Sequence, residues 1–521
     1  MSEPREHLLG IDLGTNGAKA GVIDPSGSVV CQGFREYRIA SPRPGWAEQD
    51  PHDWWSACAA AVREALSRSD IPPGSIRGIG VSGQMHGAVV LDSKGEVVRP
   101  CILWCDQRAA PQCEEINRRI GTGELARMVG NPALAGFTAP KILWLRQNEP
   151  ENYSRIKTVL LPKDYINLRL TGEVATEVSD ASGTLMFDVA GRRWSGEMLE
   201  ALDFAPDRLP PVAESGQTVG VLLPEAAREL GLAPGIPVAA GGADNACSAL
   251  GMGVFHPGRV AVSIGASGTV LAPLSEPAPD PLMRLHLFCH ALPGTWYLMG
   301  VMLSAGLSLR WFRDHLGQPE SGEAERLGMD PYQLLERMAR GAPPGCDGLL
   351  FLPYLSGERT PHADPCARGV LFGLDLSKTR AHMVRAVMEG VVFGLNDSLR
   401  IMREMGVPVQ EIISGGGGSR SDLWGQIQAD VFVQPVYRVS VSDSAMLGAA
   451  LLGGTAAGVY PSVSEACRTA VHRPDEAPSL PSTRGVYERQ YRLYRALYPA
   501  LKELFRWIPP VPGTDHHANA P

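Results

Sequence analysis

The chain has 521 residues, a net charge of −8 at pH 7 and 44% hydrophobic residues. These values are ordinary for a globular protein and exclude an intrinsically disordered or collagen-like chain. Because no block of five or six like charges occurs, we expect neither nucleic acid nor an anionic membrane as a partner. The length indicates two large domains.

The first residues, MSEPREHLLGIDLG, carry charges and lead directly into a strand-like run, without the apolar stretch of a signal peptide. We therefore expect a cytoplasmic protein. Residues 285–309 contain no charged side chain and could span a bilayer, but the Pro293-Gly294 pair favours a β-hairpin that leads into a helix. The ten cysteines are scattered, so we expect reduced thiols rather than disulfides or a zinc site.

Short β-branched runs alternate with amphipathic helical stretches along the chain, which predicts an α/β fold. The first run, HLLGIDLGTNGAKAGVID, predicts two strands joined by a tight turn at Gly14 and Gly17. The same arrangement returns in GRVAVSIGASGTVLAPL, at Gly265 and Gly268. This repeat suggests a duplicated pair of domains. We expect a first domain over residues 1–255, a second over 256–508, and a disordered tail over 509–521.

A third glycine cluster, at residues 415–418, follows the strand-like VPVQEII and precedes the helix-like SRSDLWGQIQADVF. A strand, a glycine run and a helix N-terminus in this order expose backbone N–H groups to a phosphate or nucleotide. A flexible loop is the alternative. With the two hairpins, this loop predicts a nucleotide in a cleft between the domains. The P-loop and protein-kinase motifs are absent from the sequence.

Asp12 precedes the first tight turn, so its carboxylate would face the phosphates and could hold Mg²⁺, mainly through water. An Asx-type turn is the alternative interpretation. Thr15, Asn16 and Lys19 could donate hydrogen bonds to the phosphates, although a lysine on a strand is often merely solvated.

Asp244 ends an apolar strand and opens a helix in IPVAAGGADNACSALGMG. A helix N-cap would explain it. The functional alternative is a general base that accepts the proton of an attacking hydroxyl, with Asn245 orienting the same substrate. Met85 and His86 occupy a turn between two strands, and the glycines on either side indicate close packing, for example against a small polar ligand.

Taken in order, these segments resemble the FGGY carbohydrate kinases from about residue 8 to about residue 455. The segments that carry the resemblance are GIDLGTNGAKA, WAEQDP, GQMHG, ILWCDQR, GFTAPKILW, LLPKDYINLRLTGE, SDASGTLMFD, GGADNA, SIGASG, FLPYLSGERTPH and SGGGGSRSDLW. Each segment alone is modest evidence, whereas the full set in one order is specific to this family.

The resemblance implies two actin-like (ribonuclease H-like) domains, with the sugar mainly on the first and ATP mainly on the second. It assigns the catalytic base to Asp244, the conserved N-terminal aspartate to Asp12, and the sugar contacts to Met85 and His86. It also assigns nucleotide-binding positions on the second domain: Gly265 and Ser267 in the second phosphate loop, Gly306 at a helix, and Gly416 and Gly417 in the adenine-side loop.

The activity implied by the resemblance is a Mg²⁺-dependent transfer of phosphate from ATP to a sugar. The motifs are most similar to those of members that convert D-xylulose to D-xylulose 5-phosphate and release ADP. Three alternatives remain open: a kinase for another pentulose or polyol such as ribulose, a non-catalytic sugar-binding protein, and an actin- or chaperone-like ATPase. By analogy with the family, we also expect a homodimer.

One position departs from the family pattern. The second phosphate loop usually reads Gly-Thr-Ser-Gly, and here Ala266 occupies the position of the threonine. Losing that hydroxyl costs about 1.5–3 kcal/mol if it donates to a charged phosphate. The backbone amides and Ser267 remain, so we expect weakened ATP use rather than an inactive enzyme.

Overall fold

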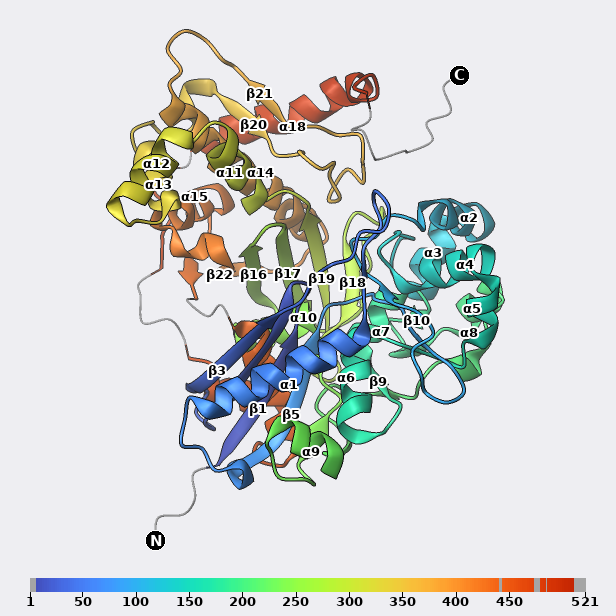
Figure 1. Cartoon of the computed structure of the whole chain (residues 1–521). Helices are drawn as coiled ribbons and strands as arrows, with labels where there is room; N and C mark the ends of the chain where they lie inside the picture. The colour runs from blue at the N-terminus through green and yellow to red at the C-terminus, as the bar shows by residue number, and fades with distance from the viewer. Residues whose placement is uncertain (1–5, 440–442, 473–477, 484, 510–521) are drawn as a thin grey trace.

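The computed structural model describes residues 6–439, 443–472, 478–483 and 485–509. Two large mixed β-sheets with flanking helices form two bodies, one above the other in Figure 1, which confirms the α/β prediction. None of the helices in these residues combines the length and apolarity needed to cross a bilayer. The ten cysteines are free thiols, as expected. Residues 510–521 of the predicted tail lie outside the described residues.

The first sheet has the order β13-β14-β5-β1-β2-β3, and β15 pairs with β5 off this path. Strands β1, β2 and β3 are antiparallel neighbours, whereas β5 and β14 continue the sheet in parallel. The strands are β1 (His7–Leu13), β2 (Gly17–Ile23), β3 (Val29–Glu36), β5 (Ile76–Gly83), β13 (Thr218–Val221), β14 (Pro237–Ala239) and β15 (Gly242–Ala243).

The second sheet repeats this plan in the order β18-β19-β17-β16-β22-β23. Strands β16, β17 and β19 are antiparallel neighbours, and β22 and β23 continue from β16 in parallel. The shared plan agrees with the repeat of hairpins in the sequence. The strands are β16 (Gly258–Ile264), β17 (Gly268–Leu274), β18 (His286–Cys289), β19 (Trp296–Met302), β22 (Val409–Gly415) and β23 (Val436–Arg438).

Short two-stranded sheets and helices surround these two sheets. The short strands are β4 (Glu48–Gln49), β6 (Val89–Leu91), β7 (Cys101–Ile102), β8 (Thr158–Leu160), β9 (Thr176–Glu177), β10 (Phe187–Asp188), β11 (Arg193–Trp194), β12 (Val212–Ala213), β20 (Leu350–Leu352) and β21 (Val370–Phe372). The helices up to the second sheet are α1 (Pro51–Ser67), α2 (Ala110–Ile120), α3 (Thr122–Val129), α4 (Thr138–Asn148), α5 (Pro150–Arg155), α6 (Pro162–Thr171), α7 (Val178–Ala181), α8 (Gly196–Leu202), α9 (Pro224–Leu230) and α10 (Asp244–Gly251). The later helices are α11 (Gly306–His315), α12 (Gln318–Leu327), α13 (Pro331–Ala339), α14 (Arg380–Glu404), α15 (Asp422–Phe432), α16 (Ser444–Ala456), α17 (Val463–Ala470) and α18 (Gly485–Phe505).

The two predicted hairpins close in similar ways. The Gly14 amide donates to the Gly17 carbonyl, and the Gly265 amide donates to the Ser267 carbonyl, each over 3.0 Å. The uncharged stretch at residues 285–309 also folds as predicted, since β18 and β19 form an antiparallel pair and α11 follows.

Helix α16 lies late in the chain but packs on the first sheet, against β1 and β5. Three glycines on these strands permit the contact. A Cβ added to Gly10, Gly78 or Gly80 would stand 2.1, 2.2 or 1.8 Å from a backbone carbonyl oxygen of α16. The helix can approach so closely only because these positions carry no side chain.

Candidate active site

The register of the first sheet places Asp12 beside the strand that leads to Asp244. Asp12 on β1 and Gly242 on β15 both pair with Ser82 of β5. Ser82 Oγ donates to Asp12 Oδ1 over 3.0 Å. The carboxylate is therefore held by a neighbouring strand rather than by an Asx-type turn. Asp244 begins α10 directly after β15, at the same end of the sheet.

Asp244 is the first residue of α10, and Ala243 occupies the N-cap position. The carboxylate therefore does not cap the helix. The backbone N–H and the side-chain Nδ2 of Asn245 both donate to Asp244 Oδ1, over 2.7 and 2.9 Å. Burial, and next the negative charge of Asp12, raise the pKa of Asp244 to about 7. A carboxylate with this pKa can accept a proton near neutral pH.

Met85 and His86 lie beside Asn245. Asn245 Nδ2 is 3.7 Å from Met85 Sδ, although 160 positions separate the two residues in the chain. His86 adopts a φ of +71°, and its Nδ1 donates to the Gly183 carbonyl over 2.7 Å. Burial lowers the pKa of His86 well below its usual value, so the imidazole is neutral. Its Nε2 is then an acceptor.

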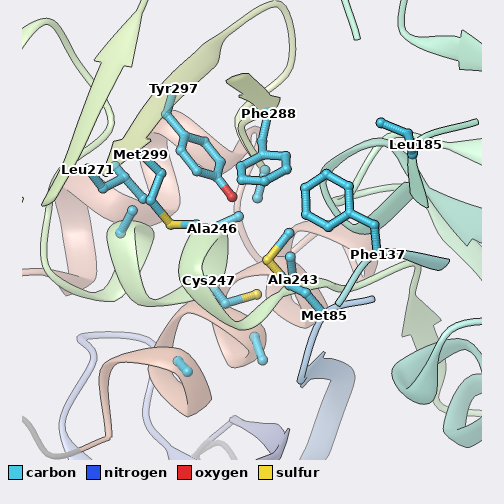
Figure 2. Close-up of a cluster of buried hydrophobic side chains, with 14 of the residues drawn as sticks. Met85, Phe137, Leu185, Ala243, Ala246, Cys247, Leu271, Phe288, Tyr297 and Met299 are labelled. Carbon is cyan, nitrogen blue, oxygen red and sulfur yellow. The ribbon is translucent and has the colours of Figure 1, made fainter. Parts of the chain in front are cut away.

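Phe137 connects the region around Met85 and His86 to the second body. Its ring stacks on His86 with centroids 4.5 Å apart and also lies 6.3 Å from Phe288 of β18. Figure 2 shows Met85 and Phe137 facing Phe288 and Tyr297 across this contact. The predicted sugar residues thus lie where the two bodies meet.

The polar residues of the first hairpin differ in their contacts within the protein and in their exposure to solvent. Thr15 Oγ1 accepts from Trp104 Nε1 over 2.9 Å. Asn16 is exposed at the turn. Lys19 Nζ forms an ion pair with Asp443, so its charge is already balanced. Of the three predicted phosphate donors, Asn16 is the side chain that solvent reaches most freely.

A cavity of about 360 Å³ on the second body brings together Gly265, Gly306 and Gly417. This volume suits a small-molecule site. Ala266 also lines the cavity, whereas Ser267 and Gly416 lie outside the lining. Gly416 instead has a φ of +77°, and a Cβ there would stand 2.7 Å from the Ile264 carbonyl oxygen. It therefore shapes the loop that presents Gly417.

Several lining residues were not predicted from the sequence. They come mainly from α11, from α13 and the residue before it, from α14, and from the segment that ends in α15: Leu309, Arg310, Asp330, Tyr332, Gln333, Glu336, Met388, Arg420, Ser421 and Trp424. Tyr332, Gln333 and Glu336 lie in an ordinary amphipathic helix without a motif, so nothing in the sequence distinguishes them from surface residues.

A buried charge cluster lies behind Asp244 and was also missed. Lys163 Nζ is 2.5 Å from Asp164, 3.6 Å from Glu177 and 3.8 Å from Asp180, and all four side chains are buried. Glu177 accepts from Ser179 Oγ over 2.9 Å, and that hydroxyl accepts from the Ala243 N–H over 3.0 Å. The cluster therefore anchors the backbone immediately before Asp244.

No group of three or more His, Cys, Asp or Glu side chains arranged to hold a metal occurs among the residues that the structure describes. Mg²⁺ usually keeps several waters and binds through one or two carboxylates together with substrate phosphates. The single carboxylate of Asp12 beside the glycine hairpin fits that mode of binding.

Comparison with known proteins identifies relatives for both halves of the chain. The model of the FGGY family of carbohydrate kinases, N-terminal domain, matches residues 7–251, and that of the C-terminal domain matches residues 260–457. The xylulose kinase of Bacillus subtilis (strain 168) is 38% identical over 501 residues, which cover 96% of this chain and 98% of the relative. The xylulose kinase of Escherichia coli (strain K12) is 39% identical, over 95% of this chain and 99% of the relative.

A solved structure described as a xyloylose kinase from Brucella ovis superposes with a TM-score of 0.87 at 38% identity, covering 96% of this chain and all of the other. Both halves of the chain, its two repeated sheets and almost all of its length therefore match one set of proteins. The chain belongs to the FGGY family of carbohydrate kinases.

Proposed function

We propose that this protein transfers the γ-phosphoryl group of ATP to the terminal hydroxyl of D-xylulose, giving D-xylulose 5-phosphate and ADP. The observation that carries the proposal is the placement of Asp244, whose pKa near 7 suits a general base. It lies beside Met85 and Asn245 on the first body. The names of the relatives support D-xylulose as the acceptor.

In this mechanism Asp244 accepts the proton of the acceptor hydroxyl as the oxygen attacks the γ-phosphorus. Both hydrogen bonds from Asn245 go to Oδ1, so Oδ2 is the oxygen that takes the proton. The neutral His86 offers Nε2 as an acceptor for a sugar hydroxyl. The anchored backbone at Ala243 fixes the carboxylate before substrate binds, which favours catalysis by orientation.

The nucleotide is proposed to occupy the cavity of the second body, with its phosphates between the two hairpins. Backbone amides at Gly265 and Ala266 would face the phosphates, because a glycine-rich loop lets the backbone approach them closely. Asp12 would hold Mg²⁺ on the opposite side. The ion would neutralise charge that develops on the phosphoryl oxygens.

The test is ADP release from purified protein with Mg²⁺ and ATP against D-xylulose, D-ribulose, L-ribulose, xylitol and glycerol, with a control lacking sugar. We expect the highest kcat/KM with D-xylulose. A higher value with another acceptor would keep the mechanism and overturn the substrate. Turnover that is independent of sugar would instead favour an ATPase.

A second candidate function is sugar binding without catalysis, and Ala266 in the phosphate loop is the observation that favours it. Saturable binding of D-xylulose without ADP release would support this candidate. The retained pair of Asp12 and Asp244 argues for the enzyme, because a binding protein has no use for a general base with a pKa near 7.

Four further expectations stay predictions: the homodimer, the cytoplasmic location, the dependence on Mg²⁺ and the domain division at residues 255 and 256. The mass of the purified protein in solution tests the first. Chelation of the divalent cation, followed by its restoration, tests the third. Limited proteolysis at the turn near His256 tests the last.

A further inference from the structure

One face of the hairpin formed by β18 and β19 is turned toward the predicted sugar residues. His286 pairs with Met299 and Phe288 with Tyr297, so these four side chains share a face. The His286 ring lies 5.8 Å from Phe137, and the Phe288 ring lies 6.2 Å from His86. The second body therefore supplies a wall opposite Met85 and His86.

Two buried polar groups on this wall have no hydrogen-bond partner in the described part of the chain. His286 is 2% exposed, and neither Nδ1 nor Nε2 is bonded. The hydroxyl of Tyr297 is likewise unpaired, and Figure 2 shows it pointing toward the space between Phe288 and Ala246. Folded proteins rarely leave such groups unsatisfied, so two of them on one face indicate a partner that the protein itself does not supply.

Arg359 is placed beside the same wall by its neighbours in the loop between β20 and β21. The Thr360 N–H donates to the Val301 carbonyl over 3.0 Å, and the Val301 N–H donates to Thr360 Oγ1 over 3.1 Å. The Leu303 N–H donates to Glu358 Oε1 over 3.1 Å. These bonds to β19 and the residue after it clamp the backbone on both sides of Arg359.

The guanidinium of Arg359 forms no ion pair or side-chain hydrogen bond within the residues that the structure describes. Its positive charge helps to lower the pKa of both His86 and His286, after the larger effect of burial. Burial raises the pKa of the adjacent Glu358 to about 8, and the charge of Arg359 opposes that rise. Arg359 is thus a half-buried cation whose charge acts on His86 and His286.

The contacts run in a row away from the reacting end. Asp244 is followed by Asn245, which contacts Met85. His86 comes next and stacks on Phe137, and Phe137 contacts His286. His286 is therefore the last member of this row, and the charge of Arg359 acts on both His86 and His286.

We propose that Arg359 and His286 bind the end of the acceptor remote from the phosphorylated hydroxyl, donating hydrogen bonds to the oxygens at C1 and C2 of the ketose. This inference rests on the proposed function. If it is correct, the second body contacts the sugar as well as ATP. Arg359 has donors only, so its guanidinium suits a carbonyl oxygen and would also bind a carboxylate. D-Xylonate, a five-carbon sugar acid, should therefore compete with D-xylulose.

The first test compares Arg359→Gln and Arg359→Lys with a control, Arg506→Gln, which removes an exposed arginine paired with Glu503. Rates are measured with either D-xylulose or ATP varied. We expect Arg359→Gln to raise the KM for D-xylulose about 10- to 150-fold, as for loss of a charge-assisted hydrogen bond, with the KM for ATP unchanged. Arg359→Lys should give a smaller rise and the control none. An unchanged KM for D-xylulose in Arg359→Gln, or a larger effect on ATP, overturns the proposal.

The second test is His286→Phe, which keeps an aromatic ring but removes both unpaired nitrogens. Since these nitrogens have no partner among the described residues, the thermal midpoint should stay the same or rise. The KM for D-xylulose should increase about 5- to 10-fold. A lower midpoint with unchanged KM would show a purely structural role and would contradict the proposal.

The third test is competition by D-xylonate, which separates failure of this inference from failure of the proposed function. Wild-type protein that turns over no sugar refutes the proposed function. Wild-type protein that phosphorylates D-xylulose but is not inhibited by D-xylonate refutes only the inference. Inhibition that is present in the wild type and absent from Arg359→Gln supports it.

Discussion

The two glycine hairpins share a backbone plan but carry different chemistry. The hairpin of β1 and β2 bears Asp12 and Lys19, and Asp12 receives a hydrogen bond from Ser82. The hairpin of β16 and β17 bears no charged side chain between Ile264 and Leu274 and instead adjoins the cavity through Gly265 and Ala266. The two hairpins therefore present different groups. The first presents charged side chains, whereas the second presents backbone without charged side chains.

Removing the carboxylates of the first body should have the largest effect. Asp244→Asn is expected to lower kcat by roughly 10²–10⁴-fold, because general-base catalysis is lost. ADP release with saturating D-xylulose and ATP measures this. Asp203→Asn, at an exposed aspartate, serves as the control. Turnover close to wild type in Asp244→Asn would disprove the assignment of the base.

The same variant has a second readout in stability. Folding raises the pKa of Asp244 from its ordinary 3.8 to about 7, so the folded state binds more protons than the unfolded state between these values. Stability therefore falls as pH rises through this range. We expect Asp244→Asn to melt at a higher temperature than the wild type at pH 8, and the difference to disappear below pH 4.

Asp12→Asn should come next, with kcat lowered roughly 10²-fold through loss of charge balance at the phosphates. It should also shift the pH profile. The charge of Asp12 contributes to the raised pKa of Asp244, so its removal moves the acid limb of kcat/KM to lower pH. A profile that keeps its midpoint would show that the two carboxylates act independently.

Adding a side-chain hydrogen-bond donor to the second hairpin should make its contacts to phosphate more like those of the first hairpin. Ala266→Thr is expected to lower the KM for ATP by about tenfold, near the lower limit for a hydrogen bond to a charged group. Ala266→Val has the same shape without the hydroxyl and is the matched control. Equal values for the two variants would exclude a hydrogen bond to phosphate.

The wild-type pH profile should show the base directly. With a pKa near 7 for Asp244, kcat/KM for D-xylulose should be about tenfold lower at pH 6 than at pH 8, because the protonated carboxyl cannot accept a proton. Initial rates in buffers of constant ionic strength measure it. A flat profile across this range would rule out the raised pKa.

The smallest effects on rate are expected from glycines around the cavity. A Cβ at Gly306 would stand 2.4 Å from the Gly265 carbonyl oxygen, so Gly306→Ala should lower stability by about 1–3 kcal/mol. A Cβ at Gly417 would meet no protein atom closer than 3.9 Å. Gly417→Ala should therefore leave the melting temperature unchanged and raise only the KM for ATP, a few-fold. Calorimetry and ATP titration separate the two.

Local patterns in the sequence predicted the parts of the site that lie in one continuous segment. The hairpins around Gly14 and Gly265, the helix that opens at Asp244 and the glycine run at residues 415–418 were all visible because each combines a strand with a turn. The resemblance to a family supplied the roles of Met85 and His86. Their contact with Asn245 joins distant segments, and no spacing in the sequence encodes it.

Three features could not be predicted for the same reason. The charge cluster around Lys163 depends on four side chains from three elements, α6, β9 and α7. The cavity wall from α13 has an ordinary amphipathic pattern. His286 and Arg359 become distinctive only in the fold, which leaves one buried and the other half-buried without side-chain partners among the described residues. Sequence patterns indicate what one segment can form, whereas these features depend on side chains that only the fold brings together.

The packing of α16 on the first sheet limits the order in which the parts of the chain can fold during synthesis. Strands β1 and β5 leave the ribosome early, but the glycine-rich face that α16 covers stays bare until translation has passed residue 456. The first half therefore cannot finish its core as a nascent chain, although domains commonly fold one after another during synthesis. The two halves must complete folding together, and a fragment ending near residue 255 would be a poor candidate for separate expression.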